Sequence, residues 1–381
     1  MGIRLLMFVC AYLCVCIIMF DAAFVVHQAA EKYLMEWRKK QIVDMLSAQL
    51  ASLEQRGKVS WLVQLKMRRR LAKADWLNCF VPAVDSFAKQ HPEFASMLFY
   101  QSVDMLTSMA KKSKRRPPEY QAELAHIIYS LNKNKTGADR SQKQLEKLHE
   151  LAESIIMGVT DKYALLRANT FGAIVSIGNI RAIRHALKII NYGDKEINVK
   201  LLSSELLELE GGYGDILDAI YTDFSQYCCA LKTCLIDFMS LIDYEEGVKK
   251  YVPEIISVLD DNAQNDEMRL AALRFFHKYS CAEAYPKIMK ILNTRSADGT
   301  FAAEAAITLR AYPCEETVAA LIEQLSDRDW YVRFNCADSL LELKVDYEQI
   351  IEKSDDKFAR EMLIYRSEVM LLKQKRGKEF G

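Results

Sequence analysis

The pattern of apolar and polar positions divides the chain into three kinds of segment. Residues 5–20 carry no charge, and after a single aspartate the apolar run continues to Val26. The following stretch, to about residue 160, places apolar side chains three and four positions apart, which is the spacing of amphipathic helices. From residue 161 onward the same spacing returns in pairs of short segments. The pattern therefore predicts an all-α protein whose first segment differs from the rest.

The first segment, residues 1–27, is predicted to be a transmembrane anchor. Its apolar run of about 22 residues is long enough, as a helix, to cross roughly 30 Å of hydrocarbon. A cleaved signal peptide would have a more basic start, a shorter apolar run and a small-residue cleavage site. A buried core helix is the other alternative, but such a helix is seldom uniformly apolar at a chain terminus.

The charges that flank the apolar run predict its orientation. Only Arg4 precedes the run, whereas Lys32, Arg38, Lys39 and Lys40 follow it. Lysine and arginine resist translocation, so the bulk of the chain is expected on the cytoplasmic side of a single-pass membrane protein. Arg38, Lys39 and Lys40 are also placed to touch anionic lipid of that leaflet.

Residues 28–160 are predicted to form a basic helical region with breaks near residues 111–118 and 132–141, where charge, proline and glycine end helices. Residues 1–160 carry 23 basic and 15 acidic side chains, a net charge of +8, whereas the remainder carries 28 and 36, a net charge of −8. Two interpretations are open for the basic clusters that start at Lys66 and Lys111: they contact anionic lipid, or they form an ordinary solvated face. Nucleic-acid binding is not expected, because no stacking aromatics or reading helix accompany the charge.

The second part of the chain contains an internal repeat of about 33 residues. Segments aligned on Arg333 carry a basic residue at the same position in five of six repeats, and the flanking apolar columns are complete. A second apolar-striped segment follows each aligned segment. About six helical hairpins over residues 161–355 are therefore predicted to stack into a solenoid, with residues 356–381 as a capping helix and tail. The aligned positions are Arg167, Lys200, Lys232, Arg269, Ala302 and Arg333.

The segments DRDWYVRFNCADSLLEL and NDEMRLAALRFF resemble the HEAT repeat of α-solenoids. The resemblance implies a right-handed solenoid in which each basic residue pairs with an acid of its own or an adjacent repeat. The C-terminal segment from Asp329 also resembles bacterial single-span HEAT proteins associated with membrane glycosyltransferases of cell-envelope polysaccharides, which implies such an assembly as the setting. The structural pairs implied by the resemblance are formed by Arg167, Lys200, Lys232, Arg269 and Arg333 with Asp161, Asp266 and Asp329.

The residues offer little catalytic chemistry. HEAT-type metal hydroxylases carry paired His-Glu motifs, but His149-Glu150 is the single such pair here. A DNA-glycosylase-like groove would be basic, whereas the repeat region is acidic. Cys228, Cys229 and Cys234 lack the paired spacing of a zinc site and are expected to be core thiols. No catalytic residue, metal, cofactor or small-molecule substrate is therefore predicted, and a HEAT-type enzyme (metal hydroxylase, lyase or DNA-glycosylase-like) with an unrecognised site is the alternative.

The second helices of the predicted hairpins carry a mainly basic strip. In a solenoid of this kind the second helices line the concave face, where a protein partner binds. A basic strip on an acidic domain would steer an acidic partner surface, unless it is only a solvated helix face. The expected function is a non-catalytic, membrane-tethered scaffold for a protein partner. The partner-binding residues so predicted are Arg181, Arg184, Lys188, Lys249, Lys250, Lys287 and Lys290.

Overall fold

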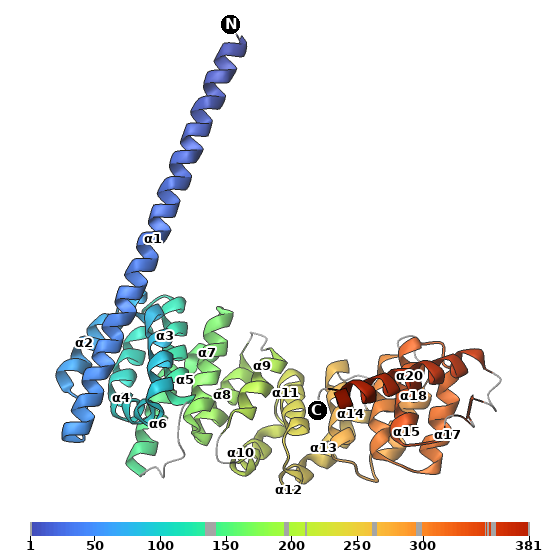
Figure 1. Ribbon diagram of the computed structural model, residues 1–381. Coiled ribbons are helices and arrows are strands. Elements are labelled where there is room, and N and C mark those ends of the chain that lie inside the picture. The colour runs from blue at the N-terminus through green and yellow to red at the C-terminus, as the bar shows by residue number, and fades with distance from the viewer. Residues whose placement is uncertain are drawn as a thin grey trace. The chain divides into compact units, whose positions relative to one another are not determined.

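A computed structural model describes residues 2–133, 142–193, 198–209, 212–260, 265–294, 299–346, 348, 350–351 and 356–379 (Figure 1). Every regular element among these residues is a helix, which confirms the all-α prediction. The chain forms two compact units, residues 1–189 and 190–381. The predicted break at residues 132–141 lies almost entirely outside the described residues. The break near residue 114 is present, because α4 ends at Ser113 and α5 begins at Pro118.

The first unit is a two-layer stack of helices. α3 packs on α1, α5 on α3 and α7 on α5, while α6 packs on α4 in the other layer. Because this alternation begins with α1, the hairpin stack starts well before the first repeat identified in the sequence. The helices of this unit are α1 (Gly2–Arg56), α2 (Trp61–Leu71), α3 (Ala74–Gln90), α4 (Pro92–Ser113), α5 (Pro118–Lys133), α6 (Gln142–Ile155), η1 (Ile156–Thr160), α7 (Ala164–Ile177) and α8 (Ile180–Tyr192), whose last residues pass into the second unit.

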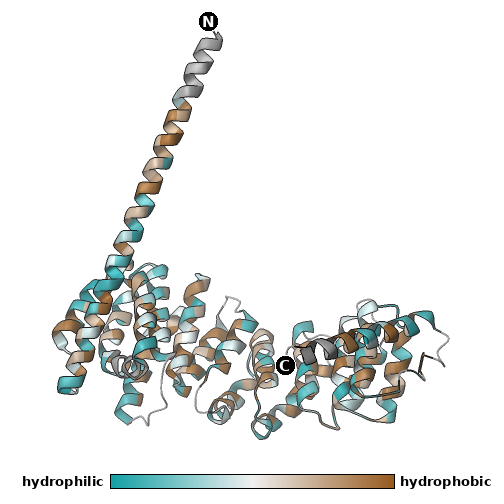
Figure 2. Cartoon of the chain, viewed as in Figure 1, coloured by the Kyte–Doolittle hydropathy of each residue, from teal (hydrophilic) through white to brown (hydrophobic). Residues whose placement is uncertain are grey.

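α1 joins the apolar segment to the core of the first unit without interruption. From Tyr12 to Trp37 its side chains are exposed, and its most apolar window has a mean hydropathy of 1.9, as the brown residues of Figure 2 illustrate. Further along, Ile42 and Leu46 are 0% and 1% exposed. By length and composition, α1 is the one helix among the described residues that is able to cross a membrane.

The second unit repeats the same two-layer plan. α9, α11, α14, α16 and α18 pack successively on one another, and α13, α15 and α17 do so in the other layer. α20 packs on α18 through buried Ala359, Met362 and Leu363. The helices are α9 (Val199–Leu207), α10 (Gly214–Phe224), α11 (Cys229–Leu241), α12 (Glu245–Val248), η2 (Lys249–Tyr251), α13 (Val252–Asp260), α14 (Asp266–Lys278), α15 (Tyr285–Asn293), α16 (Thr300–Thr308), η3 (Leu309–Ala311), α17 (Glu315–Glu323), η4 (Gln324–Ser326), α18 (Trp330–Glu342) and α20 (Lys357–Glu379).

The buried columns of the repeat match the predicted ones. Val332 and Leu340, which flank Arg333 at the two apolar positions, are both 0% exposed. The equivalent Met268 and Phe276 of α14 are 2% and 0% exposed. Each hairpin thus buries its apolar face only by contact with its neighbours, as a solenoid requires. The hairpin stack is confirmed within each unit, and the right-handed superhelix stays a prediction.

Candidate functional site

The basic residue of the aligned column binds backbone carbonyls in two repeats. Nη1 of Arg333 donates hydrogen bonds to the carbonyls six and five residues earlier, at 2.7 and 3.0 Å. Nη1 of Arg167 donates to carbonyls at the same two offsets, at 2.8 and 3.2 Å. These carbonyls belong to the turn that precedes each helix. The arginine therefore ties the start of its own helix to the incoming chain.

In the part of the chain that the structure describes, Asp161, Asp266 and Asp329 form no ion pair with these arginines, and Asp329 caps a helix instead. The carboxylate of Asp329 accepts from the N–H groups of Tyr331 and Val332, at 2.7 and 3.4 Å, as the N-cap of α18. Asp161 accepts from the N–H group two residues later, at 2.8 Å. Asp266 is exposed in the first turn of α14. The implied Arg333–Asp329 pairing is replaced by a carbonyl-bound arginine and a capping aspartate, because the carboxylate is nearer to free N–H groups.

Contacts from this column to neighbouring helices run through aromatic rings. The guanidinium of Arg269 lies 4.4 Å from the ring centroid of Phe301 in the next repeat. That of Arg333 lies 5.6 Å from the ring of Phe358 on α20. The ammonium of Lys232 lies 5.8 Å from the ring of Phe224, and Lys200 is exposed. Two of the basic residues thus reach the following helix, by cation–π contact and not by charge pairing.

Ion pairs between successive first helices lie about one turn further along than the aligned basic column. Arg274 of α14 contacts Asp237 of α11 at 2.8 Å. Arg310 contacts Asp338 of α18 at 2.9 Å, and Arg366 of α20 binds the same carboxylate. Asp237, Arg274 and Asp338 all stand five residues after the aligned column. An acid or a base recurring at that offset was the signal that would have found them.

The predicted basic strip is divided between the two units and partly neutralised. In the first unit Arg181 is exposed, and Arg184 and Lys188 both take part in interactions. In the second unit Lys250 pairs with Asp218 and Lys287 with Asp260, each on the preceding helical hairpin, and Lys249 contacts Glu245 at 3.1 Å. Lys290 is exposed. Lys250 and Lys287 therefore join adjacent repeats, and their charge is less available to a partner.

The basic residues after the apolar segment are also partly engaged. Arg38 contacts Asp75 of α3 at 3.0 Å, and Lys39 contacts Glu36 at 2.8 Å. Lys40 is exposed. Contact of these side chains with anionic lipid stays a prediction, and it would have to compete with two existing ion pairs.

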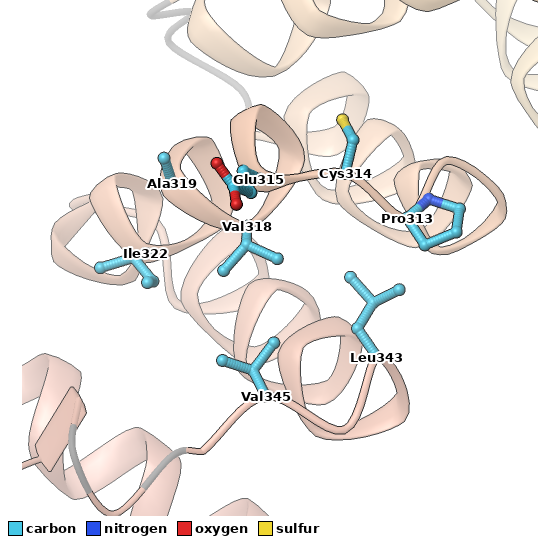
Figure 3. Close-up of a pocket in the computed structure, with 8 residues that line it drawn as sticks. All are labelled: Pro313, Cys314, Glu315, Val318, Ala319, Ile322, Leu343 and Val345. Carbon is cyan, nitrogen blue, oxygen red and sulfur yellow. The ribbon is translucent and has the colours of Figure 1, made fainter.

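A pocket of about 480 Å³ in the second unit is lined mainly by apolar side chains of α17 and of the residues that follow α18 (Figure 3). Val318, Leu343 and Val345 turn toward one another across it, whereas the Cys314 sulfur points away from them in this view. The other lining residues are Pro313, Cys314, Glu315, Ala319 and Ile322.

Cys314 is the N-cap of α17 and has an environment that favours a thiolate. Its sulfur lies 3.3 Å from the Thr317 hydroxyl and 3.2 Å from the Tyr285 hydroxyl. Hydrogen bonds from Thr317 and then Tyr285 hold the pKa of the Cys314 thiol below its usual value. Burial raises the pKa of the Tyr285 phenol to about 12. The sulfur thus contacts Tyr285 of the preceding repeat, and Cys314 also lines the apolar pocket.

The other candidate residues fall into separate surroundings. Cys234 is buried, and burial raises its pKa to about 12, as expected of a core thiol, whereas Cys228 and Cys229 are exposed because they begin α11 at its outer end. Glu150 contacts Lys111 at 2.6 Å, and Nδ1 of its neighbour His149 is buried without a hydrogen-bond partner. No group of three metal-ligating side chains occurs among the described residues.

Comparisons with known proteins assign no family to the chain. No family model matches the chain, and no curated protein matches it. Among solved structures, one titled "Crystal structure of Kap121p" matches with a TM-score of 0.42 and 13% identity. The match covers 85% of this chain and 38% of the other.

Proposed function

We propose that this chain is a non-catalytic scaffold, tethered to a membrane by α1, whose stacked helical hairpins bind a protein partner. One observation carries the proposal: α1 runs unbroken from an exposed apolar segment at Tyr12–Val26 into the core of the first unit at Ile42. An exposed apolar surface of this length is unfavourable in water and favourable in lipid. A single helix would thus fix the first unit to the membrane.

The scaffold part of the proposal rests on how the repeats use their polar groups. Arg274 and Arg310 form ion pairs with neighbouring hairpins, and Arg269 contacts an aromatic ring of the next hairpin. Cys314, whose thiol pKa is lowered, contacts Tyr285 of the preceding repeat with its sulfur. Stacked hairpins of this kind present extended surfaces to other proteins.

The finer setting rests on sequence alone. The basic residues that follow the apolar segment favour a cytoplasmic location for the two units. The resemblance of the C-terminal segment to single-span HEAT proteins favours a glycosyltransferase assembly of the cell envelope as the partner. Identification of the crosslinked partner tests this setting.

The tether is tested by membrane fractionation of the full chain and of a chain that starts at residue 28. The deletion removes only exposed side chains among those the structure describes, so the shortened protein should keep its helicity and melting temperature. The full chain should stay in the membrane pellet in high salt and leave it only with detergent, whereas the shortened chain should be soluble. A matched variant with Ile17→Lys and Val25→Lys keeps the length of α1 and should also no longer sediment with the membrane.

Crosslinking on intact membranes, followed by purification, then tests the scaffold. The full chain should retain a specific protein that the shortened chain retains poorly. Release of the full chain by salt alone would reject the tether. A salt-resistant full chain that crosslinks to no protein would reject the scaffold while leaving the tether in place.

A further inference from the structure

Two basic clusters that are distant in the sequence meet at one pocket of the first unit. The pocket has a volume of about 410 Å³ and lies among the last turns of α2 and α4 and the first turn of α5. Arg68 and Arg69 come from α2, Lys112 comes from α4, and Arg116 comes from the connection that follows α4. The remaining lining residues are Leu65, Ala72, Met109, Ser113 and Tyr120.

These four cations lack acidic partners. No carboxylate lines the pocket, and no ion pair of Arg68, Arg69, Lys112 or Arg116 is present within the described residues. Their sequence neighbours differ, because Lys111, for example, contacts Glu150 at 2.6 Å. Like charges gathered in a hollow with apolar walls concentrate a positive potential there. The pocket therefore favours an anion.

Capping of helix ends accounts for only part of this charge. Arg68, Arg69 and Lys112 stand in the last turns of α2 and α4, where the helix dipoles favour cations. Each helix end carries about half a negative charge, so the two ends together offset about one of the four positive charges. About three positive charges are left that neither a helix end nor a carboxylate among the described residues offsets.

The two hydroxyl groups that line the pocket already donate hydrogen bonds within the protein. The Tyr120 hydroxyl donates to the carbonyl of Leu71 at 3.1 Å, and the Ser113 hydroxyl donates to that of Ala110 at 2.7 Å. The guanidinium of Arg116 lies 5.7 Å from the ring of Tyr120, which holds it beside the floor. Both hydroxyls therefore already have hydrogen-bond partners, and the cations are the groups left to bind a ligand.

We propose that this pocket binds a phosphate-bearing anion. Arginine forks match the oxygens of a phosphoryl group in pairs, and a lysine adds a compact positive charge. The volume of about 410 Å³ lies in the range of small-molecule sites, so the pocket has room for the organic group that carries the phosphate.

The ligand has two possible sources, because the pocket lies at the end of α2 that is nearer to the apolar segment. Arg70 contacts Gln41 of α1 at 3.3 Å, while Ser60, at the start of α2, contacts Gln49 at 2.7 Å. α2 thus runs back along α1, and Gln41 is about 22 Å along the helix from Val26. A lipid headgroup and a soluble phosphorylated molecule share the chemistry that the pocket recognises.

The test measures binding of pyrophosphate to the full chain in a neutral detergent by titration calorimetry. The pocket variant Arg68→Gln with Lys112→Gln removes two lining charges. The control variant Lys66→Gln with Arg115→Gln removes two charges from the same sequence clusters, at exposed positions outside the lining. Loss of two charge-assisted contacts should weaken binding about tenfold or more in the pocket variant, and the control should change it by less than about threefold. Equal melting temperatures should show that both variants are folded.

The same titration identifies the source when phosphatidic acid is added to the micelles. If the natural ligand is a lipid, phosphatidic acid should displace pyrophosphate from the native chain and leave the pyrophosphate affinity of the pocket variant unaltered. If the natural ligand is soluble, phosphatidic acid should leave the pyrophosphate affinity of the native chain unchanged. Both results support the phosphate site. Equal weakening in the two double variants, or no binding of either probe by the native chain, would overturn it. Neither result depends on whether a protein partner is found.

Discussion

Cys314 begins α17 beside two hydroxyl groups, and these neighbours decide its chemistry. Thr317 and Tyr285 lower the pKa of its thiol, whereas burial raises the pKa of Cys336 in the core of the same unit. The sequence shows two cysteines 22 residues apart and nothing that separates them. Their difference comes from the fold, which leaves one at an exposed helix start and the other against apolar side chains.

The first prediction at this scale is that Cys314 reacts with iodoacetamide at a lower pH than an ordinary exposed thiol. A lowered pKa means that the thiolate, the reactive form, is already present below the usual value and increases as the pH rises through the lowered one. Thr317→Val removes the principal hydrogen bond and should shift the rate profile toward higher pH. Peptide mass spectrometry of labelled protein, with Cys314→Ser as control, gives the profile. An unshifted profile in Thr317→Val would show that the hydroxyl does not stabilise the thiolate.

The helix α18 shows which features of an element are local. Its apolar stripe and its alignment with the other repeats follow from spacing, and the structure has them where the sequence predicts. Its start at Asp329 follows from local capping of free N–H groups. The partner of Arg333 is different in kind, because it depends on the path of the turn before the helix. The implied carboxylate pair was accordingly replaced by carbonyl contacts at 2.7 and 3.0 Å.

A double-mutant cycle tests this account of the element. Arg333→Ala should cost about 1 kcal/mol by removing hydrogen bonds to two carbonyls that are at most partly buried, and Asp329→Ala should cost about 1 kcal/mol by removing the cap. Because the two side chains bind different backbone groups, their effects should add within about 0.5 kcal/mol. Chemical denaturation measures each free energy of unfolding.

The matched control for that cycle is Arg310 with Asp338, whose side chains are in contact at 2.9 Å. Arg310→Ala and Asp338→Ala should be non-additive by about 1 kcal/mol or more, since each removes the same interaction. A coupling between Arg333 and Asp329 as large as that of the control would restore the ion pair implied by the repeat resemblance.

Over the whole molecule, the hairpin alternation was predictable and the grouping of charges was not. The period of about 33 residues predicted repeats over residues 161–355, from α7 at the end of the first unit through the second unit, because a hairpin with one apolar face must stack. Before α7 the first unit has the same alternation from α1 onward without a clear basic column, so the sequence carries no repeat signal there. The meeting of Arg68 with Lys112 depends on how α2 and α4 end side by side, which no local pattern encodes.

The four predicted partner-binding lysines of the second unit also differ in their contacts and fall into two pairs. Lys250 and Lys287 form ion pairs with Asp218 and Asp260 on preceding hairpins, whereas Lys290 is exposed and Lys249 contacts only its own turn. Reversal of Lys250 and Lys287 to glutamate should lower stability, because two contacts between repeats become repulsive, at about 0.5 kcal/mol or more each. Reversal of Lys249 and Lys290 should leave the melting temperature nearly unchanged.

The last prediction is that the second pair alone reports on partner binding. If an acidic partner surface is steered to this face, Lys249→Glu with Lys290→Glu should reduce the yield of the crosslinked partner and make that yield less sensitive to salt. The melting temperature and membrane retention of the same protein are the controls for folding and tethering. An unchanged yield would mean that these lysines are a solvated helix face, and recognition would then have to be sought on the helices of the first unit, where the basic excess of the sequence lies.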